Sequence, residues 1–250
     1  MSWSKIKSIM VYFLIAMNLF MALFIAITNY RDTHVPGKVI EASAEILKRD
    51  GFNCDKKIIP ASTYELPVLD TSFYSADKLS EVFYGKQLPF KTDKDSLVAT
   101  DGDSTLTVTG NYFSYKSTEK AHGQVSEKEL RSALEKIGLN MEDSVYDEQE
   151  NCFYKMHKGV NLFNMYIKAE IDKGGSICNI SAQWPTEITE RNKAKLSFVT
   201  SVTKVKDSFP DGGKITLIEK GYALKPLGNN NYRFIPSWRV KVGKELKIIE

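Results

Sequence analysis

Histidine is the side chain most often used for acid–base chemistry near neutral pH, and the chain has three. They stand in unrelated contexts: His34 follows a long apolar run, while His122 and His157 lie in separate polar stretches. The sequence contains no HExxH, no Cys-x-x-Cys, no glycine-rich phosphate loop and no Gly-x-Ser-x-Gly. We therefore predict no catalytic residues and no cofactor-binding residues.

Two pairs of carboxylates could share acid–base work, which requires two groups held at a defined short distance. Asp101 and Asp103 form one pair, and Glu148 and Glu150 form the other. Both pairs stand in polar, turn-like sequence, where charged residues are normally solvated. Because closeness in sequence supplies no catalytic geometry, we interpret all four as surface residues.

The cysteines lack the pattern of a metal site or of a disulfide framework. Cys54, Cys152 and Cys178 are far apart in sequence, whereas zinc ligands usually come in closely spaced pairs. Their number is odd, so at least one is unpaired. Cys178 alternates with apolar residues in a strand-like segment. We interpret the cysteines as small apolar side chains and predict no metal site.

The strongest feature of the chain is an uncharged apolar run over residues 9–28, interrupted only by Asn18. Twenty helical residues rise about 30 Å, which matches the hydrocarbon thickness of a bilayer. A signal peptide would be shorter and would be followed by a small-x-small cleavage site. A buried core helix would also be shorter. The run predicts an uncleaved transmembrane helix, residues 9–29, held by bilayer lipid.

Flanking charges predict the orientation of this helix, because the cytoplasmic side carries excess Lys and Arg. Lys5, Lys7 and the free amine precede it, whereas Arg31 is followed at once by Asp32. We expect residues 1–8 to form a cytoplasmic flank. The chain is then a single-pass protein of the cell membrane with an extracytoplasmic C-terminal domain.

The remaining chain is long enough to bury a core in one large domain or two small ones. The whole sequence has 34 basic and 31 acidic residues, a net charge of +3, and two of the basic residues precede the apolar run. The outer part is therefore close to neutral. It has no Lys/Arg cluster interleaved with aromatic residues, so we predict no nucleic-acid partner.

Helical periodicity and capping residues predict helices in this outer part. The clearest begins at a capping box, Ser126 with Glu129. The β-branched content of the last segment would also permit a strand, but the spacing of Phe198, Val202 and Val205 favours a helix. The expected helices are residues 39–51, 75–84, 126–137 and 190–209.

Alternating apolar and polar residues predict strands. The clearest are residues 160–171 and 177–184, which a Lys173-Gly174-Gly175 turn joins into an antiparallel hairpin with one buried face. We interpret residues 91–95 as a charged loop. The other expected strands are residues 57–59, 97–99, 105–109, 112–115, 214–219, 222–224, 232–235, 238–242 and 246–249.

These elements predict an α+β fold: one N-terminal transmembrane helix and an outer domain of antiparallel sheets with flanking helices. Residues 30–37 would connect the helix to a first α+β subdomain, 38–118. A polar linker around residues 116–124 would lead to a second, 124–250. Helices that are each followed by a turn and strands suggest a duplicated helix–sheet unit.

Asn18 is the polar residue with the most informative position, because an amide in a membrane favours a hydrogen-bond partner. A bond to a second helix contributes about 0.6–2 kcal/mol. The alternative is a local bond within its own helix. Ala16, Ala22 and Ala26 would allow a second helix to come close. The candidate partner-binding residues are Phe13, Leu14, Asn18, Phe20 and Ala22.

Motifs at the two ends of the chain resemble the YycI family. The first is Met1-Ser2-Trp3-Ser4-Lys5-x-Lys7-x-Ile9, followed by Phe13-Leu14 and by Asn18-x-Phe20. The second is Gly221-Tyr222 and then Pro236-Ser237-Trp238-Arg239-Val240. Residues 55–185 add little to the resemblance, and the final Lys247-Ile248-Ile249-Glu250 departs from the aromatic ending of the family.

This resemblance implies a non-enzymatic membrane regulator in a low-GC Gram-positive bacterium. Such proteins pair with a YycH-type protein and modulate the WalK/YycG-type sensor histidine kinase that controls the cell wall. The implied fold is related to YycH and to PepSY-like units. An alternative is an extracytoplasmic ligand-binding or inhibitor-like envelope module of the PepSY type that binds lipid or peptide. The motif residues expected to be structural are Trp3, Lys5, Gly221, Tyr222, Pro236 and Trp238.

Overall fold

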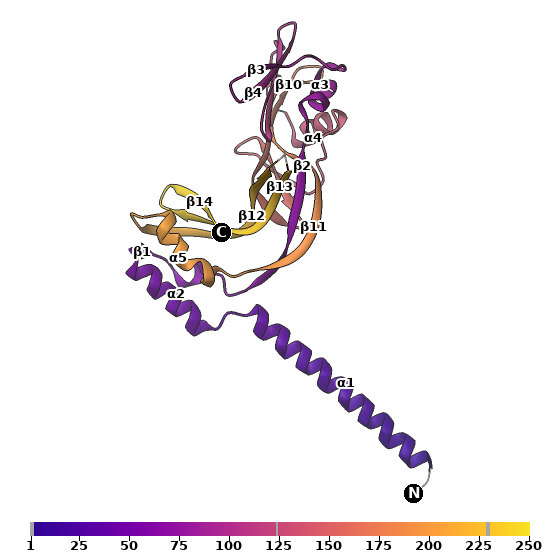
Figure 1. The fold of residues 1–250 in the computed structure, drawn as a ribbon, viewed down its shortest axis with the longest axis vertical. Helices are drawn as coiled ribbons and strands as arrows, with labels where there is room; N and C mark the ends of the chain where they lie inside the picture. Colours follow the sequence, from indigo (N-terminus) through magenta and orange to yellow (C-terminus); the bar gives the residue numbers. More distant parts are fainter. Residues whose placement is uncertain (1–2, 124, 229–230) are drawn as a thin grey trace. The chain divides into compact units, whose positions relative to one another are not determined.

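A computed structural model describes residues 3–123, 125–228 and 231–250 of the chain. It is a mixed α+β structure, as the sequence predicts (Figure 1). Its helices and strands form two compact units, and each unit is assembled from segments that are distant in sequence. One unit comprises residues 1–65, 195–218 and 240–249, and the other comprises residues 66–194, 219–239 and 250.

These units cut across the division expected from the sequence, in which subdomain 38–118 preceded subdomain 124–250. The reason lies in two long strands, β12 (Gly213–Gly228) and β13 (Asn231–Val242). Each is long enough to contribute residues to both units. The sequence suggested shorter strands in their place, because charged residues and glycines interrupt the apolar alternation.

The N-terminal apolar run forms one unbroken helix, α1 (Trp3–Thr33). Within its segment Ile6–Thr33, an 18-residue window has a mean hydropathy of 2.4, and none of that window is buried. Among the described residues it is the one helix long and apolar enough to span a bilayer. The helix continues through the first half of the connector expected at residues 30–37.

The outer end of α1 is tied to the chain that precedes β2 (Tyr64–Phe73). The Thr63 N–H donates to the Thr33 carbonyl at 2.8 Å, and the Val35 N–H donates to the Ala61 carbonyl at 2.9 Å. Val35 is buried, and Pro36 follows as the N-cap of the next helix. Backbone hydrogen bonds, rather than a flexible tether, therefore hold the end of α1.

In the first unit, α2 (Gly37–Arg49) packs on α5 (Phe198–Ser208) through apolar residues that include Leu47 and Val202. Strand β1 (Phe52–Asn53) pairs in parallel with the start of β12, and β14 (Glu245–Ile249) pairs with β13. The strand expected at residues 57–59 is wrong. A 3-10 turn, η1 (Lys56–Ile58), lies there because the Asp55 carboxylate accepts the Lys57 N–H.

The helix expected at residues 190–209 is correct only in its second half. Residues 190–196 belong to β11 (Pro185–Leu196), and α5 follows. Pairing with β2 decides this outcome: the Thr71 hydroxyl donates to the Glu187 carbonyl at 2.7 Å, and Arg191 forms an ion pair with Asp70. These contacts join residues more than a hundred positions apart, so local propensity cannot reveal them.

In the second unit, a helix followed by four antiparallel strands occurs twice in succession. Strands β6 and β10 pair antiparallel and join the two sets, and both helices lie on the same side of the strands (Figure 1). The first set is α3 (Ala76–Tyr84), β3 (Lys91–Asp93), β4 (Ser96–Asp101), β5 (Ser104–Thr109) and β6 (Tyr112–Lys116). The second set is α4 (Glu127–Lys136), β7 (Ser144–Asp147), β8 (Cys152–His157), β9 (Val160–Ile171) and β10 (Ile177–Gln183).

Several expectations for this unit are confirmed. Ser126 and Glu129 form the capping box of α4, and Ser75 caps α3, which ends at Gly85. The hairpin of β9 and β10 buries alternate residues, including Ile167 and Ile180. Two details differ: residues 91–93 form edge strand β3 instead of a loop, and β12 joins β9 in parallel, so the pairing is not wholly antiparallel.

Candidate functional site

The candidate partner-binding residues of α1 do not share one face. At about 100° per residue, Phe13 and Phe20 lie about 20° apart, whereas Leu14, Asn18 and Ala22 form a stripe on the other side. All five are exposed to the surroundings of the helix. One straight partner helix would therefore contact one of these two sets.

The helix is divided in composition as well. Asn18, Ala22, Ala26 and Asn29 lie within about 80° of one another, a sector that earlier in the helix holds Val11 and Ile15. Three phenylalanines lie within about 40° on the opposite side. Small and polar residues permit close helix–helix contact in membranes, and large apolar residues suit lipid. The phenylalanines of the second face are Phe13, Phe20 and Phe24.

Asn18 makes the local hydrogen bond that was one of its two expected outcomes. Its Nδ2 donates to the Leu14 carbonyl one turn earlier, at 3.0 Å. Thr28 and Thr33 make similar bonds to carbonyls of the preceding turn. An amide has two N–H donors and a carbonyl acceptor. The local bond uses one donor and leaves the Asn18 side chain able to bond to a second helix.

Of the six family-motif residues, Trp3 and Lys5 lie outside the residues whose side chains the structure describes. Gly221 stands where β12 meets β9, paired with Asn161. A Cβ at this position would come within 2.2 Å of Phe163 Cζ and 2.8 Å of the Asn161 carbonyl oxygen. The glycine is therefore required by the close approach of the Phe163 ring.

Charged groups stabilise the point where β12 meets β9 at Gly221, which we call the β12–β9 crossing. The Arg239 Nη2 donates to Glu219 Oε2 at 2.6 Å, and its guanidinium carbon lies 4.8 Å from the centre of the Phe163 ring. The other Glu219 oxygen accepts from Asn161. Tyr222 and Trp238 are each 1% exposed, and Pro236 is half-buried. The described motif residues at this end are thus packing residues.

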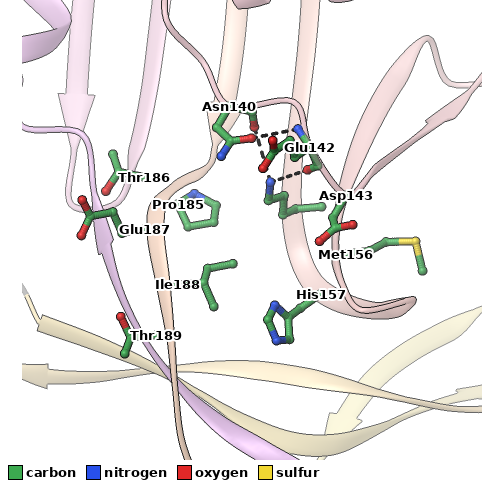
Figure 2. A pocket seen from close by; sticks show the side chains of 11 residues that line it. Asn140, Glu142, Asp143, Met156, His157, Pro185, Thr186, Glu187, Ile188 and Thr189 are labelled. Carbon is green, nitrogen blue, oxygen red and sulfur yellow. Dashed lines mark hydrogen bonds between the residues drawn. The ribbon is translucent and has the colours of Figure 1, made fainter.

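A hollow of about 400 Å³ lies between β8, the start of β11 and the loop before β7 (Figure 2). It falls within the size range of small-ligand and peptide sites, although its lining is mostly polar. The residues that line it are Asn140, Glu142, Asp143, Lys155, Met156, His157, Pro185, Thr186, Glu187, Ile188 and Thr189.

Lys155 is the buried cation of this hollow, with 6% of its surface exposed. Its Nζ donates to the carbonyls of Asn140, at 3.4 Å, and Glu142, at 2.5 Å, as the dashed lines in Figure 2 mark. It also lies 5.2 Å from the centre of the Trp184 ring. Burial lowers the pKa of the Lys155 ammonium, because desolvation disfavours the charged form.

His157 stands at one end of the hollow in a second charged cluster. Its Nε2 lies 2.7 Å from Glu190 Oε1, and Lys158 Nζ lies 2.7 Å from the same oxygen. The hydrogen bonds from Lys158 and His157 hold the pKa of the Glu190 carboxyl below its usual value, with the Lys158 contact the larger cause. The Tyr222 ring meets His157 edge-on at 6.3 Å. Burial raises the pKa of Tyr222 to about 12.

Sequence reasoning missed this hollow because its walls are distant in the chain. Glu190 is 33 residues from His157. One local signal was present: Lys155 follows Phe153 by two positions in β8, which places a lysine on the buried face of a strand.

The pairs Asp101 with Asp103 and Glu148 with Glu150 are exposed, as expected, and do not line the hollow. Within the described ranges, no three His, Cys, Asp or Glu side chains converge as a metal site.

No protein-family model and no curated protein matches the chain. A crystal structure of an uncharacterized protein from Eubacterium rectale is similar to it, with 10% sequence identity and a TM-score of 0.41. The similarity covers 79% of this chain and 85% of that chain.

Proposed function

We propose that this chain is a non-enzymatic, membrane-anchored regulatory protein with a cytoplasmic N-terminus and an extracytoplasmic C-terminal domain. It modulates a sensor histidine kinase of the WalK/YycG type, which controls the cell wall, and it acts together with a YycH-type partner. Contacts of the transmembrane helix and of the outer domain carry the regulation. The end motifs that resemble the YycI family support this assignment.

The observation that carries the proposal is the exposure and division of α1. In its apolar 18-residue window, the described part of the chain buries none of the residues of α1. A plain anchor requires only apolar residues, but α1 separates small and polar residues from phenylalanines. That separation is what a helix with one partner side and one lipid side requires.

The end of α1 supports a signalling role as well. The backbone bonds from Val35 and Thr63 join the helix to the segment that leads directly into β2. A shift or rotation of the membrane helix is therefore passed to β2 rather than lost in a loose tether. This continuity suits a protein that relates events in the membrane to an outer domain.

The repeated order of one helix and four strands supports a proposal about the origin of the fold: we propose a duplicated unit related to PepSY domains.

A PepSY-like envelope module that binds lipid or peptide is the alternative function. Its distinguishing feature would be a deep apolar pocket between a helix and the sheet. The hollow between α4 and the β9–β10 hairpin instead has Lys128, Lys136 and Lys173 in its lining.

The test uses the full chain and a WalK-type kinase in the same lipid nanodiscs. A photo-crosslinking phenylalanine analogue is placed at position 22 on the small face or, as the matched control, at position 20 on the aromatic face. We expect trapping of the kinase or the YycH-type protein from position 22 and little from position 20. Kinase autophosphorylation should change when residues 9–28 are replaced by an unrelated apolar helix. Unchanged trapping and kinase output after that replacement would falsify the role of α1.

A further inference from the structure

The polar hollow borders the edge of a strand rather than one face of a sheet. Five consecutive residues of β11, from Pro185 to Thr189, line it. Successive side chains of a strand point to opposite faces, so five consecutive lining residues place the hollow alongside the backbone. Figure 2 shows the β11 ribbon passing between these side chains, with Ile188 and Pro185 on the side of His157.

This edge is the free one. Strand β11 ends the strand order of the sheet and, among the described residues, is hydrogen-bonded to β2 alone. The Glu187 carbonyl accepts the Thr71 hydroxyl from β2, so the backbone of Glu187 faces β2. Backbone groups of a strand alternate in direction. The N–H and C=O of Thr186 and Ile188 therefore face away from β2.

The charges around the hollow are unequal. Glu142, Asp143 and Glu187 are exposed carboxylates at its border. Lys155, the one lysine among the described residues of the lining, is buried against two backbone carbonyls, and His157 bonds to Glu190. The accessible border is therefore negative and complements a basic ligand.

We propose that the hollow is a docking site for an extended, basic polypeptide segment of a partner, which adds a strand along Thr186–Thr189. Main-chain hydrogen bonds to a free edge supply affinity in this mode of recognition, and side-chain contacts supply selectivity. Lysine or arginine side chains of the segment lie against Glu142, Asp143 and Glu187. The proposal goes beyond the proposed function, because it requires neither a kinase nor a membrane contact.

The probe is a fluorescent eight-residue peptide of alternating Lys and Val, blocked at both ends. It is added to the full chain in phosphatidylcholine nanodiscs, whose uncharged surface does not attract lysine. Two matched peptides are the controls: alternating Glu and Val, and the Lys-Val peptide with N-methyl groups on every second residue. N-methylation removes the strand-forming N–H groups without altering the protein. We expect fluorescence anisotropy to show binding at least about tenfold weaker for each control.

Two protein variants locate the site. Glu187→Gln should weaken binding of the Lys-Val peptide about two- to fivefold, as expected for one exposed ion pair. Glu135→Gln, the same change on the exposed side of α4, should leave binding unaltered. Equal binding of the N-methylated peptide would overturn strand addition, and equal effects of the two variants would overturn the location. Pairing of a second copy of this chain along β11, seen as a concentration-dependent dimer that the peptide does not disrupt, would also overturn the proposal.

Discussion

The two ends of the chain carry motifs of the same resemblance but opposite physical character. Asn18 and its neighbours on α1 are exposed, and no other segment within the described residues covers them. Gly221, Tyr222 and Trp238 are enclosed by strands, and a single methyl group at Gly221 would collide with Phe163. The first motif can therefore contact a partner without cost to folding. The residues of the second motif must be packed in the interior for the fold to form.

The motif residues at the two ends therefore act through different physical effects. A motif residue that is buried reports how the chain packs, and its replacement acts through stability. A motif residue that is exposed on an apolar helix can contact a partner, and its replacement acts through association. Variants at the two ends should therefore differ in which measurement they change, and this difference can be tested directly.

The largest expected effect is that of Gly221→Ala. The added Cβ would lie 2.3 Å from Phe163 Cε1, and the Arg239 guanidinium carbon lies 4.8 Å from the centre of the same ring. Overpacking typically costs about 1–3 kcal/mol of unfolding free energy, and so short a contact with a buried ring places the cost near the upper end. Urea unfolding of the full chain in nanodiscs, followed by tryptophan fluorescence, measures the loss.

Two controls test whether the loss of stability comes from the contact with Phe163. Gly37→Ala places the same methyl group where nothing lies within 4 Å, and it should be neutral or slightly stabilising. Combining Gly221→Ala with Phe163→Leu shortens the obstructing side chain and should recover part of the loss. Equal stability of Gly221→Ala and wild type would show that the crossing of β12 and β9 is looser than the structure indicates.

A smaller effect is expected at Lys155, which is buried like Gly221 but charged. Lys155→Met removes the Lys155 donor from the Glu142 carbonyl, at a cost of about 1–3 kcal/mol, whereas the Asn140 carbonyl keeps the Trp184 indole N–H at 2.9 Å. The cost should depend on pH. The pKa of Lys155 is lowered in the folded state, so between that value and the unfolded value the unfolded chain binds more protons. Wild type should therefore gain stability relative to Lys155→Met as pH rises through this interval.

The unfolding free energies of wild type and Lys155→Met, measured side by side from pH 7 to pH 10, provide the check. Arg131→Met is the matched variant, because Arg131 also donates to this loop, at the Met141 carbonyl, and also lies over a ring, that of Phe153. Arginine stays protonated throughout this range. A pH-independent difference for Lys155→Met, like that expected for Arg131→Met, would contradict the assigned effect of burial.

At Tyr222 the expected change of stability with rising pH is opposite in sign to that at Lys155. Burial raises its pKa to about 12, so the unfolded tyrosine ionises near pH 10 while the folded one stays neutral. Its contribution to stability is complete below pH 10 and is lost as pH rises toward 12, by up to about 2–3 kcal/mol. Tyr222→Phe should lose less stability than wild type between pH 9 and pH 12. Parallel pH curves for the two proteins would contradict the burial of the phenol.

The sequence predicted the features that local patterns encode. The capping box at Ser126, the alternation of β9 and β10 and the length of α1 each arise within one continuous segment. The sequence did not predict β11 as a strand from residue 185, because Thr71 and Asp70 on β2 hold it there. It did not predict the hollow either, since Lys155 and Glu187 line it from β8 and β11, which are distant in the sequence. Gly221 was recognised as a motif residue, but its reason, the Phe163 ring, is visible only in the fold.

The smallest expected effect on stability lies at Asn18. Asn18→Leu removes one local hydrogen bond from an exposed helix, so the unfolding free energy of the outer part should change by less than about 0.5 kcal/mol. Association should respond more strongly, because the amide retains groups that can bond across to a second helix, a contribution of about 0.6–2 kcal/mol. Crosslinking from position 22 should therefore fall in Asn18→Leu, while the matched Phe20→Leu change on the opposite face leaves it unaltered. A fall in urea stability without a fall in crosslinking would reverse the assignment, and would place Asn18 with Gly221 among the residues that hold the fold.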